Sequence, residues 1–448
     1  MLGELEQRLD GSSSRALADA VVAAMAEGVL VAGTRLPPIR IVARELGLSP
    51  TTVSAAWALL RRSATIRTDG RRGTVVVGRR SDADSRYRLA VDHATTFALD
   101  LSTGVPDEVL LPDLRPALRS LSARATRASY LDDAVLPELV TLLRDDWPYA
   151  VGDLSVHDGA MDALELVART VVGFGDRVVV ENPGFPPLVD LLESLGATLV
   201  PVPIDESGLR VDALAAALRT PVTAVFLQPR AHNPTGVSLT PAREKELALV
   251  VGSSPVTWVV EDDSAGAVAS SEDVSLGRHV PDQVVHVRSF AKSHGPDLRL
   301  AALSAPPVLL DRLLATRRLG QGWTSRLLQQ VLIGLLTQER SVAAVAAARA
   351  EYRRRRQALT RALAVRGVTV GGDDGINLWV PVADETAAVV RLAARGIGVA
   401  QGSPFWLDGG PPHVRLTSGL FAGVGDDLER LADEVAAAAR VGAWSARR

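Results

Sequence analysis

The sequence predicts an α/β protein in two parts, a small helical head with a basic hairpin and a large body built on a mainly parallel sheet. Two observations lead to this prediction. Residues 1–79 hold three short helical patterns followed by two β-prone runs, and from about residue 98 onward short apolar runs alternate with helical patterns. Such alternation is typical of a buried parallel sheet covered by helices. The 448 residues are 47% hydrophobic and 23% charged, which excludes disorder over most of the chain.

The first 79 residues have the element order of a winged helix-turn-helix, a fold that binds DNA. Gly47 is expected to end the second helix, and Ser49 followed by Pro50 to begin the third. This segment holds eleven arginines against seven acidic residues, a net charge of +4, whereas the whole chain is at −3. A basic head on an acidic body indicates a nucleic-acid-binding module joined to another domain. The expected helices lie at residues 13–28, 39–46 and 50–62, and the expected strands at residues 65–67 and 73–77.

The segment after the head is polar, charged and without periodicity, and we expect it to be a linker. The predicted domains are therefore a DNA-binding head at residues 1–79, a linker at 80–97 and an effector domain at 98–448. In the effector domain the expected strands lie at residues 176–180, 198–202, 222–227, 257–260 and 283–287, and the expected helices at 187–195, 211–218 and 241–250.

The composition points to one residue in particular. Only Lys245 and Lys292 are lysines among 49 basic residues, and the rest are arginines, which cannot form a Schiff base. Cysteine is absent, which excludes disulfides and thiolate metal sites, and no metal is expected. Residues 1–10 lack the basic region of a secretory signal, and no apolar run approaches the roughly 18 residues of a membrane span. We therefore expect a cytoplasmic protein.

Two segments of the head carry a recognisable pattern, "GVLVAGTRLPPIRIVARELGLSPTTVSAAWALL" and "TDGRRGTVVV". Together they resemble the DNA-binding head of the GntR regulator family, over roughly residues 10–79. Pro50 and Ser54 stand where family members often carry arginine, so base readout by the third helix is expected to differ. The resemblance implies a double-stranded DNA operator as partner. The residues implied to contact it are Arg40, Thr51, Thr52 and Ser54, with Arg71 and Arg72 in the wing.

Four segments follow one another in the body: "ENPGF", "HNPTG", "VVEDDSAG" and "VRSFAKSHGPDLRL". In this order and spacing they resemble the fold-type I aminotransferases, which bind pyridoxal 5′-phosphate (PLP). With the head, the chain resembles the MocR group of GntR-family regulators over nearly its whole length. The resemblance implies a large domain with a mainly parallel sheet, a small domain, PLP as cofactor and a head-to-tail homodimer.

Each part of PLP needs a particular chemical group. The resemblance implies that Lys292 forms the Schiff base with the aldehyde, and that Asp262 pairs with the pyridine nitrogen, with Asp263 as the alternative. The phosphate needs several donors, including the backbone N–H groups at the start of a helix. The other implied cofactor residues are Asn233 for the 3′-oxygen, Phe185 for stacking on the ring, and Ser289, Arg299, Gly159, Ala160 and Met161 for the phosphate, with Tyr130 reaching the phosphate of the other subunit.

Four positions bear on the effector and on how well PLP is held. Arg415 in "PHVRLTSGLF" matches the arginine that binds an amino acid α-carboxylate in this family. Pro187 stands where GABA-responsive members carry a second arginine, so a γ-amino acid is not expected as effector. Ser264 replaces a tyrosine common in the family, and Asp158 lies in the phosphate turn, where its charge repels phosphate unless it is turned away.

We expect a transcriptional regulator that senses PLP or an adduct of PLP with an amino compound, with at most slow or half transamination. Two alternatives stay open. The first alternative is an active aminotransferase with an N-terminal extension, and the winged helix argues against it because a metabolic enzyme has no need of one. A DNA-binding protein whose aminotransferase-like domain has lost its cofactor is favoured by Ser264 and Asp158, and disfavoured by the set of PLP-binding residues as a whole.

Overall fold

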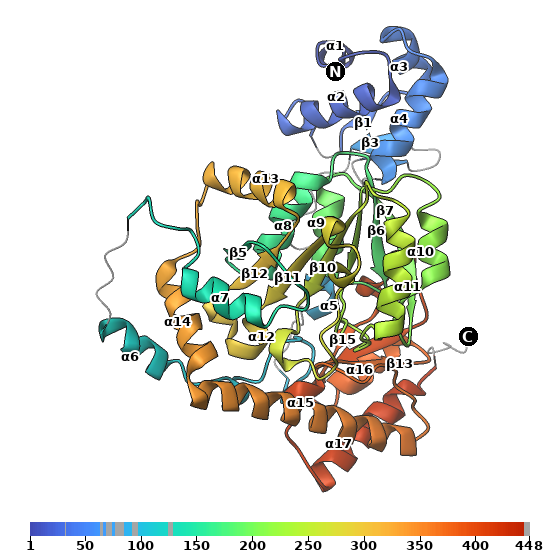
Figure 1. Cartoon of the computed structure of the whole chain (residues 1–448). Helices are drawn as coiled ribbons and strands as arrows, with labels where there is room; N and C mark the ends of the chain where they lie inside the picture. The colour runs from blue at the N-terminus through green and yellow to red at the C-terminus, as the bar shows by residue number, and fades with distance from the viewer. Residues whose placement is uncertain are drawn as a thin grey trace, which may run out of the picture.

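The structure is a computed structural model of the whole chain, and it describes residues 1–31, 33–62, 66–68, 74–76, 85–91, 97–123 and 129–442. Figure 1 shows the helical head at one end of the molecule, a central sheet covered by helices, and the C-terminal elements at the opposite end. The predicted order of a winged helix-turn-helix followed by an α/β body is confirmed.

The head forms three principal helices and a small sheet. Its elements are α1 (Leu2–Glu6), α2 (Ser14–Ala26), β1 (Arg35–Leu36), α3 (Ile39–Glu45), α4 (Pro50–Arg62), β2 (Ile66–Thr68) and β3 (Thr74–Val76). The predicted cap of α4 is confirmed, because the Ser49 hydroxyl accepts the backbone N–H of Thr52 at 3.0 Å. The sequence did not predict β1, which adds a third strand to the hairpin in the order β1-β3-β2.

A short helix that the sequence did not predict lies within the linker segment. This helix, α5 (Arg86–Val91), is shorter than two turns, so no periodicity identifies it and contacts with other elements must stabilise it. Arg86 makes these contacts by donating to the carboxylates of Asp190 at 2.7 Å and Glu193 at 2.6 Å on the large domain. The described part of the linker is therefore attached to α9 (Pro186–Ser194) through Arg86, and Ala90 of α5 also packs in an apolar cluster with Trp379, Ala400 and Phe405.

The head also contacts the body directly, at the turn that precedes strand β6 (Arg177–Asn182). Phe174 in this turn packs against the apolar core of the head. Arg15 of the head donates to the carbonyl of Phe174, and its guanidinium lies 3.7 Å from the carboxylate of Asp176. Apolar packing of Phe174 and the polar contacts of Arg15 thus join the head to the body.

The large domain is built on an eight-stranded sheet with the order β5-β12-β11-β10-β9-β6-β7-β8 among the described residues. Its strands are β5 (Leu154–His157), β6 (Arg177–Asn182), β7 (Thr198–Asp205), β8 (Gly208–Leu209), β9 (Ala224–Leu227), β10 (Trp258–Asp263), β11 (Val284–Ser289) and β12 (Ala301–Ser304). The five predicted strands are confirmed, and they pair in parallel. The strands that the sequence did not predict are β5, β8 and β12, and β12 and β8 run antiparallel to their neighbours.

Helices cover both faces of this sheet. Strand β6 is apolar on both of its faces, so each face needs a cover. Val178 and Val180 join the apolar core on the side of α8, whereas Val179 joins the core on the side of α11. The helices are α6 (Arg115–Ala123), α7 (Pro137–Asp145), α8 (Ala160–Val171), α9 (Pro186–Ser194), α10 (Val211–Ala217), α11 (Pro241–Gly252), α12 (Ala291–His294), α13 (Pro307–Arg318) and α14 (Arg326–Thr337).

The C-terminal elements form the predicted small domain around a second core. Its elements are α15 (Glu339–Val365), β13 (Leu378–Pro381), α16 (Glu385–Ala393), β14 (Ile397–Gly398), β15 (Ala400–Gln401), β16 (His413–Leu416) and α17 (Asp426–Ala439). Strand β4 (Leu99–Asp100), which follows the linker, pairs in parallel with β14. None of the described helices is by itself long and apolar enough to cross a membrane. Helices α14 and α15, bent by 74° where they meet, would be long and apolar enough only if they were taken together.

Candidate cofactor-binding site

The candidate site lies at the edge of the sheet where β10 and β11 end. These strands are neighbours and run parallel, so their carboxyl ends meet at one edge, the usual place for a ligand in an open α/β sheet. Lys292 lies on α12, which follows β11, and its Nζ donates to the carbonyl of Ser264 just beyond β10 at 3.1 Å. The fold therefore brings the "EDDS" and "AKSH" segments together.

Lys292 lies in surroundings that suit an amine nucleophile. Burial lowers its pKa, and the positive charge of Arg415 lowers it further, while the carboxylate of Asp262 acts in the opposite direction. A lowered pKa leaves more of the amine unprotonated near neutral pH, which is the form that attacks an aldehyde.

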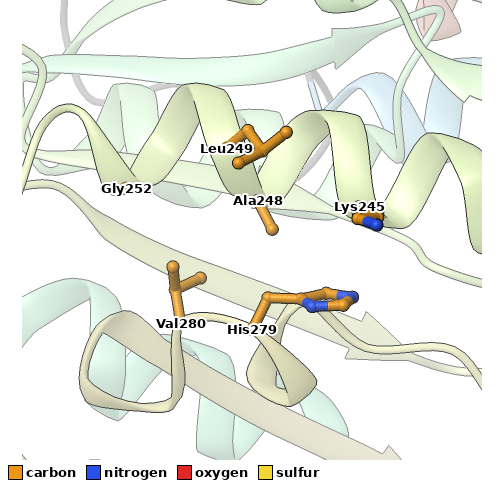
Figure 2. Close-up of a pocket in the computed structure, with 6 residues that line it drawn as sticks. All are labelled: Lys245, Ala248, Leu249, Gly252, His279 and Val280. Carbon is orange, nitrogen blue, oxygen red and sulfur yellow. The ribbon is translucent and has the colours of Figure 1, made fainter.

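The other lysine of the chain lies elsewhere. Figure 2 shows Lys245 on α11, at a hollow of about 280 Å³. The remaining residues around this hollow are Ala248, Leu249, Gly252, His279 and Val280. Lys245 is exposed, and none of the described residues predicted to hold PLP lines the hollow. Lys245 therefore lies on a solvated helix face.

Asp262 has one carboxylate oxygen left for a ligand. The residue is only 2% exposed, and its Oδ2 accepts a hydrogen bond from Gln228 Nε2 at 2.7 Å. Its Oδ1 is buried, and no described residue donates to it. Burial raises the pKa of Asp262 to about 6. Leaving a buried carboxylate oxygen unpaired is costly, and the N–H of a protonated pyridine ring would satisfy it.

Asp263, the alternative partner for the pyridine nitrogen, is already engaged. Its buried carboxylate accepts a hydrogen bond from Arg230 at 2.6 Å. Burial acts to raise the pKa of Asp263, but Arg230, His286 and Arg288 together lower it to about 2. Successive residues of a strand point to opposite faces, so Asp262 and Asp263 cannot both face the same ligand. This geometry favours Asp262.

Asn233 and Arg415 meet from the large and the small domain. Arg415 is buried, and it donates to Asn233 Oδ1 at 3.2 Å and to the carbonyl of Ser102. Because Asn233 Oδ1 accepts this bond, the amide nitrogen of Asn233 is the group suited to donate to a 3′-oxygen. Gly104 has a φ of +70°, which favours glycine, and a Cβ atom there would lie 3.1 Å from the guanidinium of Arg415.

Gly159, Arg299 and the start of α8 form a cradle for an anion. Helix α8 begins at Ala160, so the first N–H groups, including that of Met161, have no acceptor within the helix. Gly159 has a φ of +103°, which favours glycine, and a Cβ there would lie 3.0 Å from Arg299 Nη2. Arg299 also donates to the carbonyl of Asp158 at 3.0 Å. These groups are suited to bind a phosphate.

The side chain of Asp158 is held by two donors that the sequence did not identify. Its carboxylate accepts hydrogen bonds from Arg317 at 3.1 Å and from Gln321. Arg317 is only 7% exposed, and it also donates to His157 and, at 2.6 Å, to Thr324. The carboxylate of Asp158 in the phosphate turn is therefore paired with a buried arginine from α13, which also lies 3.5 Å from the carboxylate of Asp162.

Three further predicted cofactor residues differ in how far their side chains are exposed to solvent. Phe185 precedes α9 and packs against the large-domain core, and Ser289 is buried at the end of β11. Tyr130 is 88% exposed and makes an edge-on contact with Trp323, with 5.5 Å between ring centroids. That Tyr130 reaches the phosphate of a partner subunit stays a prediction.

The helix-turn-helix exposes part of the predicted DNA-contacting set. The exposed members are Arg40, Thr51 and Ser54. Thr52 is half-buried, and its hydroxyl lies 2.8 Å from the Ser49 hydroxyl that caps α4. Arg71 and Arg72 lie outside the described residues.

Comparison with known proteins gives a family match for each part. Residues 98–433 match the family "Aminotransferase class I and II", and residues 13–76 match "Bacterial regulatory proteins, gntR family". The chain is 33% identical to the vitamin B6 salvage pathway transcriptional repressor PtsJ of Salmonella typhimurium, over 91% of this chain and 95% of that protein. It is 27% identical to the HTH-type transcriptional regulator TauR of Rhodobacter capsulatus, over 88% of this chain and 90% of that protein.

Among solved structures, the chain is similar to an archaeal alanine:glyoxylate aminotransferase with a TM-score of 0.68. The two are 20% identical, and the similarity covers 77% of this chain and 91% of that one. At this identity the likeness shows a shared fold for the body and nothing about its reaction.

Proposed function

We propose that the body of this protein senses PLP or an adduct of PLP with an amino compound. The premise is that the chain belongs to the aminotransferase class I and II family and is a DNA-binding transcriptional regulator with a gntR-family head. The family of the body is typically PLP-dependent. The name of the relative PtsJ refers to vitamin B6 salvage, which supports PLP as the signal.

The observation that carries this proposal is the unpaired Oδ1 of Asp262 beside Lys292. A buried carboxylate is stable only when it is hydrogen-bonded, paired or protonated, and here one oxygen has no partner among the described residues. A pyridinium N–H supplies such a partner, and a lysine amine within reach of Asp262's charge supplies the attachment for an aldehyde.

The remaining residues fit the rest of the cofactor. When bound, PLP supplies an aldehyde that reacts with amines and a ring that withdraws electrons. Lys292 would hold the cofactor covalently, Asp262 would keep the proton on the pyridine nitrogen, and Asn233 would donate to the 3′-oxygen. The phosphate would lie against Arg299 and the first N–H groups of α8.

The effector is, in this proposal, PLP itself or an α-amino compound. Arg415 offers a guanidinium for an α-carboxylate, close to Asn233. Pro187, at the start of α9, has no charge with which to bind a distal carboxylate. We propose further that the protein acts in the cytoplasm as a head-to-tail homodimer, which presents two heads to an operator with repeated half-sites.

The cofactor-free alternative loses one of its two supports. It was favoured by the charge of Asp158, and that charge is balanced by Arg317. Ser264 still lacks the reach of a tyrosine, but its hydroxyl lies 3.3 Å from Gln228 Nε2 and its carbonyl accepts from Lys292, so this residue has a place in the site.

The test is an absorbance titration of the purified protein with PLP, followed by operator binding with and without PLP and amino acids. We expect a visible band, covalent labelling of Lys292 after borohydride reduction, and operator affinity that changes on PLP or amine binding. A protein that takes up no PLP would favour the cofactor-free alternative. Sustained transamination between an amino acid and a keto acid, at roughly 1–1000 turnovers per second, would favour the alternative of an active aminotransferase.

A further inference from the structure

Gln228, a residue absent from every predicted set, lies at the centre of the cofactor-binding residues. It follows β9 and is buried. Its side-chain nitrogen donates to Asp262 Oδ2 at 2.7 Å and to the Ser264 hydroxyl at 3.3 Å. Its side-chain oxygen accepts the backbone N–H of Asn233 at 2.7 Å. Both donors and the acceptor of this amide are therefore used.

The orientation of this amide is determined by its partners. The backbone nitrogen of Asn233 can only donate, so the atom facing it must be the oxygen of Gln228. The nitrogen then faces Asp262 and donates to it. The main chain of Gln228 is anchored as well, because its N–H donates to Glu181 Oε2 at 2.8 Å. The amide thus has one stable arrangement.

Asp262 and Asp263 differ in the charge of their hydrogen-bond donors, and their pKa values differ accordingly. Asp263 is hydrogen-bonded by the cation Arg230, and its pKa falls to about 2. Asp262 receives its hydrogen bond from an amide that carries no charge, and burial raises its pKa to about 6. A carboxylate that is not neutralised by an arginine keeps its attraction for a second proton-bearing group, such as a pyridinium.

We propose that Gln228 is a positioning residue for PLP, which holds Asp262 toward the pyridine nitrogen and Asn233 toward the 3′-oxygen through one neutral amide. This inference rests on the proposed function, since it requires that PLP binds at Lys292. Ser264 belongs to the same network, because its carbonyl accepts from Lys292 and its hydroxyl contacts the amide. Gln228 therefore contacts Asp262 and Asn233 directly and is connected to Lys292 through Ser264.

The test replaces Gln228 with Glu, which has the same shape but puts an oxygen in place of the donor nitrogen. Two carboxylates at hydrogen-bond distance lose their second proton only at a raised pH, so they share a proton at low pH and repel once both are ionised at high pH. We expect the Kd for PLP to be close to wild type near pH 6, and about 10- to 100-fold weaker near pH 8.5, where the charge-assisted bond is lost. The charged and titratable groups around the new carboxylate are Asp262, Asp263, Glu181, His232, Lys292 and Arg415.

The measurements are the PLP Kd and the position of the visible band, each followed against pH in the full-length protein. Gln283→Glu is a matched control, because Gln283 is also a buried amide but donates to the carbonyls of Ser254 and Thr257, outside the predicted site. Its pH dependence of PLP binding should equal that of the wild type. Gln228→Met, which removes donor and acceptor together, should weaken PLP binding at both pH values.

The outcomes separate this inference from the proposed function. If the wild-type protein does not bind PLP, the proposed function fails. If the wild type binds PLP and Gln228→Glu shows the same Kd and band position as wild type at both pH values, the role of Gln228 is refuted. If Gln228→Glu does not fold, as judged by circular dichroism, Gln228→Met decides, and unchanged PLP affinity in that variant refutes the role equally.

Discussion

Replacing Arg317 with Met tests whether the phosphate turn depends on a distant cation. Arg317 is buried on α13 and holds the carboxylate of Asp158 at 3.1 Å, with Asp162 at 3.5 Å. Methionine keeps the apolar stem and removes the guanidinium. We expect Asp158 to become an unbalanced negative charge beside the helix start that is proposed to bind the PLP phosphate.

The geometry gives an expected loss of unfolding free energy and an expected loss of PLP affinity. Removing one member of a buried ion pair costs about 3–5 kcal/mol. The side chains of Asp158 and Asp162 are 28% and 38% exposed, so water screens part of this loss and we expect about 1–3 kcal/mol less unfolding free energy. Repulsion of about 1–2 kcal/mol between a partly exposed carboxylate and the phosphate weakens PLP binding roughly 10-fold.

The assays are urea unfolding of the cofactor-free protein and PLP titration at low and high salt. Adding Asp158→Asn to Arg317→Met should restore most of the PLP affinity, because it removes the repelling charge. Arg318→Met, at an exposed neighbouring position, is the control and should change neither quantity. If Arg317→Met binds PLP as tightly as wild type, or if Asp158→Asn gives no recovery, the assigned role of Arg317 is wrong.

Four further outcomes are expected. Lys292→Ala should prevent borohydride from fixing PLP to the chain, and labelling that persists would assign the covalent bond elsewhere. Arg40→Ala should weaken binding to every DNA sequence and reduce the slope of log affinity against log salt by about 1, as measured by gel shift. Because burial raises the pKa of Asp262 to about 6 from 3.8, the cofactor-free protein should lose about 3 kcal/mol of unfolding free energy as the pH rises from about 4 to 8. Asp262→Asn should remove that loss, so its urea midpoint should exceed that of wild type near pH 8 and approach it near pH 4. If an amino acid is the effector, Arg415→Ala should abolish the response of operator binding to it while PLP uptake persists.

Much of the fold follows from local patterns. The capping serine of α4, the parallel strands and their covering helices each depend on residues within one segment, so the sequence alone predicted them. The composition also singled out Lys292, because one of only two lysines lies in a segment where an amine is needed. The antiparallel strand β12 was missed, since four residues that are all buried are too few to show the alternation that identifies a strand.

Other features were decided by tertiary structure. The sequence left Asp262 and Asp263 as alternatives, and the structure distinguishes them by placing Arg230 beside one and Gln228 beside the other. Arg317 reaches Asp158 across 159 residues, a separation at which no sequence pattern indicates a contact.

The sequence by itself thus determined the order of the two domains and the chemical groups available in each motif. The tertiary structure decided which of those groups are neutralised and which remain for a ligand. The physical reason is that helices, caps and strand faces arise from neighbouring residues, whereas the charge state of a buried carboxylate depends on whatever the sheet and helices bring within a few ångströms of it. A neutral amide beside Asp262 and an arginine beside Asp158 are such long-range outcomes.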